Sequence, residues 1–276
     1  MPSPFDVVGN WTEVKEDIIR EYAVPYAKIL SRQSWSKGFA FIDAMAGPGH
    51  AISKTTGSLI AGSPAVALAV EPRFDEFHFI ESDPNKADEL QRLVSGRPEA
   101  HVYRGDCNRI LIDEIFPKFP YVSRKRALCV IDPYKLNLNW ELFETAGKLK
   151  TIDLILNFPV MDMNMNVLWQ NPSGVRSDQS ARMNAFWGDD SWRAATYNTQ
   201  FGMLGEDREL KGSPTAIINA FKQRLVDKAG FEYVAEPIPM RTPSGAIVYW
   251  LFFASNNSTA LKIAEQVFKK HRSRTG

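Results

Sequence analysis

Cysteine is scarce in this chain: only Cys107 and Cys129 occur among 276 residues, without the spacing of a metal site or a redox pair. That scarcity fits a reducing compartment and argues against zinc, so we expect no metal site. A long uncharged apolar run is also missing, so no transmembrane helix is predicted. The net charge is only +1, which gives no overall attraction to nucleic acid or membranes. The charged N-terminal residues contain no apolar signal core, and we therefore expect a cytoplasmic protein that binds no membrane.

The signatures of several enzyme classes are missing as well. No Gly-Lys-Ser/Thr phosphate loop and no Gly-x-Ser-x-Gly elbow occurs, and the four histidines lack helix-borne metal spacing. A dinucleotide fingerprint would need a small residue three positions after Gly49, where the chain has Ile52. A nucleotide-binding hydrolase and an NAD enzyme are therefore disfavoured.

Apolar strand patterns alternate with helical patterns along the chain, which predicts an α/β fold with a Rossmann-like, mostly parallel sheet and helices on both faces. The expected strands are 39–43, 77–80, 101–104, 127–131, 152–158, 233–240 and 246–254. The last two are joined by the turn 242–245, so the sheet should end in an antiparallel hairpin. Long helices are expected at 12–32, kinked by Pro25, and at 258–271.

No low-complexity linker divides the chain, so residues 1–276 are expected to form a single domain. Two Gly-Ser-Pro segments, 62–64 and 212–214, predict helix starts, with Ser63 as the cap and Pro64 in the first helical position. A long polar loop is expected over 50–62. Residues 160–212, rich in Met, Asn and Trp, are expected to form a helical insertion above the ligand edge of the sheet.

The first strand ends in a carboxylate, Asp43, and opens into a turn that contains Gly47 and Gly49. In open α/β sheets, ligands bind outside the carboxyl ends of the strands, and glycine lets the backbone approach them closely. We therefore expect a cofactor or nucleotide-like ligand over these glycines, although an ordinary strand-to-loop corner would have the same pattern.

The second and third strands also end in acids. Glu81 is expected to accept the hydroxyls of a ribose, with Asp83 as the second choice and as the more natural cap of the helix that starts at Pro84. Asp106 is expected to accept from an adenine amino group or to cap the following helix, and one residue can do both.

The fourth strand delivers Asp132, Pro133 and Tyr134 to the same edge. A carboxylate and a backbone carbonyl can hold the protons of an exocyclic amine, and an aromatic ring can stack on a base for roughly 1–3 kcal/mol. An ordinary turn with Tyr134 in the core is the alternative. Asn157, at the end of the fifth strand, either helps to close the site or satisfies local backbone groups.

Three local clusters of basic residues stand out against the balanced net charge. They contain Lys118, Arg124, Lys125 and Arg126; Lys269, Lys270, His271, Arg272 and Arg274; and Arg176, Arg182 and Arg193. Cations among aromatics suit an RNA or DNA surface, and solvated helix ends are the alternative.

Six short motifs follow one another along the chain in a characteristic order. They are 41–49 (Phe-Ile-Asp-Ala-Met-Ala-Gly-Pro-Gly), Gly62-Ser63-Pro64, Glu81-Ser82-Asp83, Asp132-Pro133-Tyr134, Asn157-Phe158-Pro159 and Phe186-Trp187-Gly188. This ordered set, which covers most of the chain, resembles the three-Cys-motif partner protein (TcmP) family. The resemblance implies a class I S-adenosylmethionine-dependent methyltransferase with that cofactor. It also implies a protein partner, since the family is named after a neighbouring protein with a radical-S-adenosylmethionine-like cysteine triad.

The motif at Asp132 is also similar to the Asp/Asn-Pro-Pro-Tyr/Phe motif of amino-methyltransferases that act on adenine, from which this chain departs by having a single proline. On these resemblances we expect the cofactor to be bound by Asp43, Ala46, Gly47, Pro48, Gly49, Glu81, Ser82, Asp106 and Cys107. Asp132, Pro133 and Tyr134 are the expected catalytic residues. The leading hypothesis is N-methylation of a nucleic acid base or nucleotide. The alternative is a non-catalytic partner subunit or an RNA-binding module.

Overall fold

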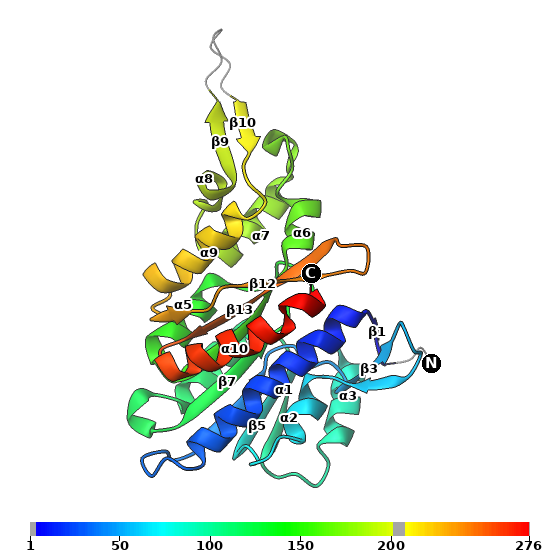
Figure 1. The fold of residues 1–276 in the computed structure, drawn as a ribbon, viewed down its shortest axis with the longest axis vertical. Helices are drawn as coiled ribbons and strands as arrows, with labels where there is room; N and C mark the ends of the chain where they lie inside the picture. Colours follow the sequence, from blue (N-terminus) through cyan, green and yellow to red (C-terminus); the bar gives the residue numbers. More distant parts are fainter. Residues whose placement is uncertain (1–3, 201–207, 276) are drawn as a thin grey trace.

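The computed structural model describes residues 4–200 and 208–275 and is built around a mostly parallel eight-stranded sheet (Figure 1). The strands follow the order β11-β13-β8-β7-β2-β5-β6, and β12 also pairs with β13. The parallel strands are β2 (Phe39–Asp43), β5 (Glu76–Glu81), β6 (Ala100–Arg104), β7 (Arg126–Ile131) and β8 (Ile152–Phe158). The long β13 (Ile247–Ser255) runs antiparallel to β8. The predicted fold class, with its antiparallel final hairpin, is confirmed.

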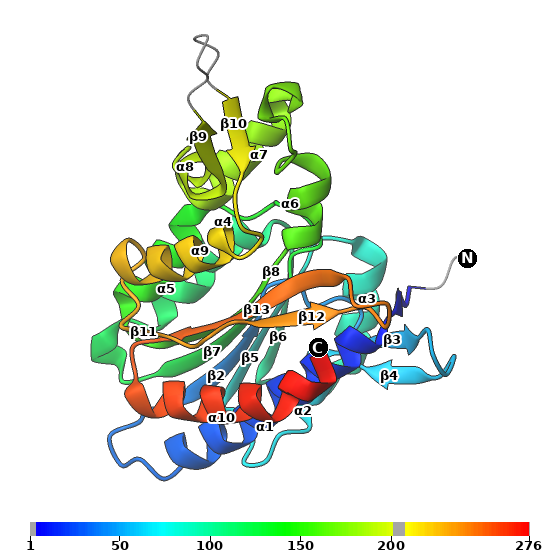
Figure 2. The ribbon, with the colours of Figure 1, turned by 45° about the horizontal axis from the view of Figure 1, so that its top comes forward.

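Helices cover both faces of the sheet, so its central strands are apolar at most positions. One face is covered by α1 (Asn10–Leu30), α2 (Ser63–Leu68), α3 (Pro84–Leu93) and α10 (Ser258–Thr275). The other face is covered by α4 (Cys107–Ile110), α5 (Trp140–Leu149) and α9 (Ala216–Asp227). Figure 2 shows α1 and α10 lying side by side beneath the sheet.

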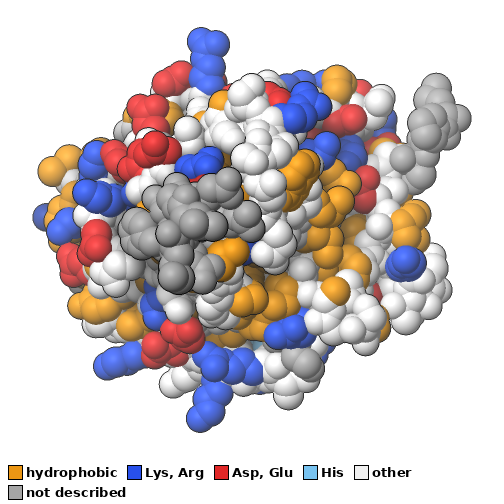
Figure 3. Space-filling model, turned by 90° about the horizontal axis from the view of Figure 1, so that it is seen from above, with side chains coloured by type: hydrophobic (Ala, Val, Ile, Leu, Met, Phe, Trp, Pro, Cys, Tyr) orange, Lys and Arg blue, Asp and Glu red, His pale blue; other side chains and the backbone are white. Residues whose placement is uncertain are grey.

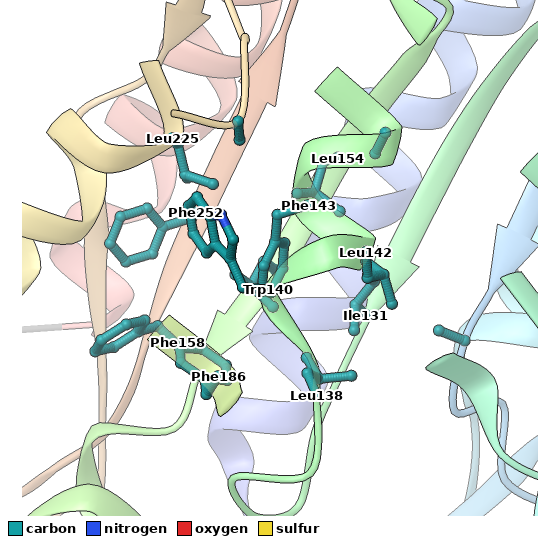
Figure 4. Close-up of a cluster of buried hydrophobic side chains, with 14 of the residues drawn as sticks. Ile131, Leu138, Trp140, Leu142, Phe143, Leu154, Phe158, Phe186, Leu225 and Phe252 are labelled. Carbon is teal, nitrogen blue, oxygen red and sulfur yellow. The ribbon is translucent and has the colours of Figure 1, made fainter. Parts of the chain in front are cut away.

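An aromatic cluster joins the 160–212 segment to the second face (Figure 4). Phe158 of β8 lies 4.7 Å from Phe221 of α9 between ring centroids, and Phe252 of β13 packs on both. Phe186 of α7 (Ser177–Trp187) stacks on Phe221 at 5.5 Å. These buried rings fix the segment to the sheet next to the carboxyl end of β8.

The 160–212 segment contains more than the expected helices. After α6 (Val160–Asn166), α7 and α8 (Trp192–Thr196), the strands β9 (Tyr197–Gln200) and β10 (Arg208–Lys211) pair as an antiparallel hairpin. The part of the segment at 201–207 lies outside the described residues. Figure 1 shows strands β9 and β10 at the top of the molecule, beyond α8 and α9.

The expected polar loop over 50–62 was wrong. It contains β3 (His50–Ser53) and β4 (Leu59–Ala61), which join β1 (Val7–Val8) in a small sheet. These strands are too short for a clear alternating pattern, and they are fixed by contacts such as the hydrogen bond from Ser53 to Glu13. The expected cap was also misplaced, because Gly62 is the N-cap of α2 and Ser63 is its first residue.

The expected strand 233–240 is divided into β11 (Tyr233–Val234) and β12 (Ile238–Arg241). Pro237 lies in the break, where a missing backbone amide would interrupt the hydrogen bonds of a continuous strand. The helix expected to open at residues 212–214 begins slightly later, at Ala216. Within the described ranges, every helix is too short or too polar to cross a lipid bilayer.

Candidate functional site

The carboxyl end of β2 forms a buried acid next to an open glycine turn. Asp43 is fully buried, and one of its oxygens accepts from the Met45 amide at 3.2 Å. The Ser63 side chain also stabilises the ionised carboxylate, while Oδ2 has no hydrogen-bond partner among the described residues. Gly47 has a φ of +62°, and a Cβ at this position would meet no atom within 4 Å. Gly49 has a φ of +87°, and a Cβ there would overlap the Leu93 side chain. The turn therefore requires glycine and leaves free space above Gly47.

Glu81, at the end of β5, lies beside this turn. Its carboxylate accepts from the Gly47 amide at 2.9 Å and from the Asp83 amide at 2.7 Å. Asp83 accepts from the amides of Asn85 and Lys86, so its predicted role as the cap of α3 is confirmed. Ser82 is exposed between them. The structure thus brings Glu81 to the glycine turn and leaves Asp83 at the helix.

The end of β6 also carries a helix cap. Asp106 is exposed and accepts from the Asn108 amide at 3.0 Å, which makes it the N-cap of α4. Cys107 is buried, and burial raises the pKa of its thiol to about 12, so it is an inert packing residue rather than a thiolate. Buried Asn108, which sequence reasoning missed, donates to the Asn137 carbonyl and accepts from the Asn139 amide. Asn108 thereby fixes the loop that follows Asp132.

Asp132, at the end of β7, accepts hydrogen bonds from two side chains. Asn157 of the adjacent β8 donates to one carboxylate oxygen, and Lys15 of α1 donates to the other. The Asp132 side chain is still 34% exposed, whereas Lys15 is only 6% exposed. Pro133 is buried and Tyr134 is 87% exposed, so the alternative that placed Tyr134 in the core is wrong. Asp132 is therefore held firmly but remains accessible to a second molecule.

Lys15 and Glu16 are site residues that sequence reasoning missed. Both are buried, and their charged groups lie 3.2 Å apart. Lys15 occupies the apolar stripe of α1, three and four residues before Ile18 and Ile19, and a charged residue in such a stripe was the available signal. Lys15 is thus the one cation of this cluster, beside two buried acids, Glu16 and Asp43, and the partly exposed Asp132.

The electrostatics of this acidic group follow from burial. Desolvation raises the pKa of Glu16 from 4.5 to about 7, and the Lys15 ammonium only partly opposes the rise. Desolvation likewise raises the pKa of Asp43 from 3.8 to about 6. Burial lowers the pKa of Lys15, but the carboxylates of Asp132 and Glu16 outweigh this and hold it well above its usual 10.5. The cluster therefore contains a permanent cation and two carboxyl groups that titrate near neutral pH.

Most of the expected basic clusters do not face this edge. Residues 118–126 lie at the amino end of β7, away from Asp132, and Lys125 pairs with Glu76 at 2.6 Å. The C-terminal residues Lys270 and Arg274 pair with acids of α1. Arg176, Arg182 and Arg193 each lie within 4 Å of a carboxylate in their own region. Ion pairs within the chain thus engage most of the basic residues that were expected to form a nucleic-acid surface.

Comparisons with known proteins identify the fold. No family model matches the chain, and no curated protein matches it. A solved structure of protein LPL1258 from Legionella pneumophila, of the family DUF519, is 13% identical over 94% of both chains, with a TM-score of 0.51. A candidate S-adenosylmethionine-dependent methyltransferase from Listeria monocytogenes (12% identity, 86% and 99% coverage) has a TM-score of 0.43. The N-terminal domain of EvdMO1, solved in the presence of S-adenosylhomocysteine and D-fucose, also has a TM-score of 0.43 (10% identity, 86% and 82% coverage). The likeness to LPL1258 shows a shared fold over almost the whole of both chains.

Proposed function

We propose that this protein is an S-adenosylmethionine-dependent methyltransferase that methylates a nitrogen of a nucleic acid base or nucleotide. The supporting observation is the meeting, at one edge of the sheet, of the open turn at Gly47, the half-paired carboxylate of Asp43 and the accessible Asp132. A fully buried carboxylate oxygen without a partner carries a desolvation cost, which an ammonium group in the site would offset.

The residues at this edge fit S-adenosylmethionine, which supplies an electrophilic methyl group when bound. In this proposal Asp43 and residues 46–49 hold the amino-acid end of the cofactor, Glu81 and Ser82 its ribose, and Asp106 with Cys107 the adenine side. Glu81 already accepts two backbone hydrogen bonds, and a carboxylate has lone pairs for about four. Its capacity for ribose hydroxyls is therefore not exhausted.

The substrate nitrogen would be positioned by Asp132. An exocyclic amine is a poor nucleophile because its lone pair is delocalised into the ring, and acceptors for its protons favour the reactive, tetrahedral form. Asp132 is fixed by Lys15 and Asn157 with lone pairs to spare, and the backbone carbonyl of Pro133 is the second acceptor in this proposal. The Tyr134 ring is exposed, with the Lys135 ammonium 5.7 Å from its centroid, and in this proposal it stacks on the base. Catalysis would come mainly from this positioning.

The direct test of the proposal is calorimetric titration of the purified protein with S-adenosylmethionine and with S-adenosylhomocysteine. We expect saturable binding of both compounds with one site per chain. A chain that binds neither compound, or that binds NAD or ATP at this edge instead, would contradict the proposed function.

Cofactor affinity is expected to depend on pH through Asp43. Only the ionised carboxylate attracts an ammonium group, and its pKa of about 6 means that roughly a tenth is ionised at pH 5. The dissociation constant for S-adenosylmethionine should therefore be roughly tenfold larger at pH 5 than at pH 7.5. Lys15, Glu16 and Asp132 also act on Asp43, so Asp43→Asn is the matched control. That variant should bind weakly with little pH dependence, and an equal pH dependence in both proteins would assign the effect to Glu16.

The resemblance to the three-Cys-motif partner family supports a second proposal, a subunit that assists a radical enzyme. One observation favours it: both carboxylate oxygens of Asp132 already have partners within the chain. Co-purification with a three-cysteine protein, together with absence of methyl transfer to RNA or DNA, would favour this role over catalysis.

A further inference from the structure

A cavity of about 230 Å³ lies in the 160–212 segment, outside the cluster around Asp132. Its wall combines the end of α6, the base of the β9–β10 hairpin and the approach to α9. The residues that matter here are Asn164, Thr196, Lys211 and Ser213. None of them belongs to the motifs that led to the proposed function.

Lys211 gives this cavity a cationic wall. Its ammonium donates to the side-chain oxygen of Asn164 at 2.8 Å and to the Leu168 carbonyl at 2.5 Å. Within the part of the chain that the structure describes, these two bonds use two of its three protons. Among the described residues no carboxylate forms an ion pair with Lys211, and partial burial lowers the pKa of its ammonium. A partly desolvated cation that no acid of the described residues pairs with favours an anionic ligand.

Two hydroxyl groups add hydrogen-bonding capacity to the wall. Thr196 is 5% exposed, and its hydroxyl has no hydrogen-bond partner among the described residues. Ser213, which is exposed, shares a 2.9 Å contact with the Thr215 hydroxyl. An ammonium together with hydroxyl groups is the donor set that proteins use for phosphate oxygens.

Helix α6 connects the cavity to the candidate site. It begins directly after β8, whose Asn157 donates to Asp132, and Asn164 lies one turn along it, roughly 6 Å from Val160 on the helix axis. Asp162 of α6 accepts from the Leu136 amide, which holds the loop of Tyr134 against this helix. Figure 2 shows α6 rising from the sheet edge toward the hairpin.

Exposed apolar side chains accompany this path. Tyr134 is 87%, Met165 67% and Trp169 40% exposed, and the Trp169 indole donates to the Met165 carbonyl. The face seen from above has hydrophobic side chains near its centre and Lys and Arg at several points around them (Figure 3). Aromatic surfaces next to cations are typical of sites for single-stranded nucleic acid.

We propose that the substrate is a single-stranded polynucleotide with one base at Asp132 and a backbone phosphate of a flanking nucleotide in the Lys211 cavity. This inference rests on the proposed function and narrows it from free nucleotides to a strand that follows α6. Tyr134 and Trp169 would support unstacked bases along the way.

The test uses the full chain and a fluorescein-labelled, mixed-sequence single-stranded RNA oligonucleotide, followed by anisotropy over a range of salt concentrations. Lys211→Met should weaken binding several-fold and reduce the slope of log K against log salt by about 0.7, the value for one lost phosphate contact on a single strand. Lys228→Met, which removes an exposed cation beyond the end of α9, should leave both values unchanged. Lys211→Arg should retain the salt slope.

Several outcomes would overturn the inference. A salt slope unchanged in a folded Lys211→Met protein would exclude the phosphate contact. If Lys211→Met fails to fold, the affinity of Thr196→Val for RNA replaces it as the test. We expect Thr196→Val to weaken RNA binding, and an unchanged affinity would count against the site. A mononucleotide mixture, inorganic phosphate and a polyglutamate peptide are the competing ligands. If one of them binds as tightly as the RNA and with the same dependence on Lys211, a polynucleotide is excluded as the substrate. Titration with the cofactor tests the proposed function separately from RNA binding. A protein that binds S-adenosylmethionine but no RNA would therefore refute this inference and leave cofactor binding intact.

Discussion

Replacing Asp132 with alanine is expected to reduce methyl transfer by at least about a hundredfold while the affinity for S-adenosylmethionine changes little. The carboxylate is one-third exposed at the end of β7 and is the accessible acid of the cluster, whereas Asp43 is fully buried. Lys15 keeps Glu16 as an ion-pair partner in this variant, so the fold should survive. Single-turnover assays with radiolabelled cofactor would measure the first effect, and calorimetry the second.

A matched control is Asp88→Ala, which removes an equally charged but half-exposed carboxylate that pairs with Arg104 on the surface of α3. This variant should retain both turnover and cofactor affinity. If Asp132→Ala loses cofactor affinity and turnover in parallel, Asp132 belongs to the cofactor site. If its turnover is unchanged, the proposed role of Asp132 in orienting the substrate is wrong.

The parallel strands could be predicted because each is a short apolar run that ends at a polar residue. Asp43 and Asp132 are adjacent to such runs, and strands of one direction bring their carboxyl ends to one edge. The small sheet of β1, β3 and β4 could not be predicted, because two to four residues carry no periodic signal. Its pairing depends on contacts between distant segments, such as the register of Val7 with Ile52.

The candidate site was predicted in part for the same reason. Strand-end acids are local features, and the role of Asp83 as a helix cap follows from its position before Pro84. The partner of Asp132 is not local, since Lys15 lies 117 residues earlier in the chain. Nothing in the sequence near Asp132 points to Lys15 as its partner, although Lys15 interrupts an otherwise apolar helix stripe.

The Lys15 ammonium should also be essential for stability, and Lys15→Met is expected to lower the free energy of unfolding by about 3–5 kcal/mol at pH 8. The substitution leaves Glu16, Asp43 and Asp132 close together without a cation. Methionine fills a similar volume, so the loss would come from the uncompensated carboxylates rather than from a cavity. Urea unfolding followed by circular dichroism would measure it, with Lys28→Met as the control on the exposed face of the same helix.

The pH dependence separates this electrostatic cause from a packing defect. Glu16 and Asp43 have folded-state pKa values of about 7 and about 6, above their ordinary 4.5 and 3.8, and loss of the cation raises both further. A carboxyl group with a raised folded-state pKa supports folding fully below its ordinary value, and that support is lost as the pH rises through the folded-state value. The Lys15→Met deficit should therefore shrink markedly between pH 8 and pH 5, as both acids become protonated.

Adding Asp132→Asn to Lys15→Met should recover part of the stability at pH 8, because one of the unpaired charges is then removed. Lys28→Met, by contrast, should cost less than about 1 kcal/mol at either pH, since Lys28 only complements the helix end. A Lys15→Met deficit that is the same at pH 5 and pH 8 and is not relieved by Asp132→Asn would show that Lys15 acts through packing. In that case the account of Lys15 as the cation that stabilises Glu16, Asp43 and Asp132 would be wrong.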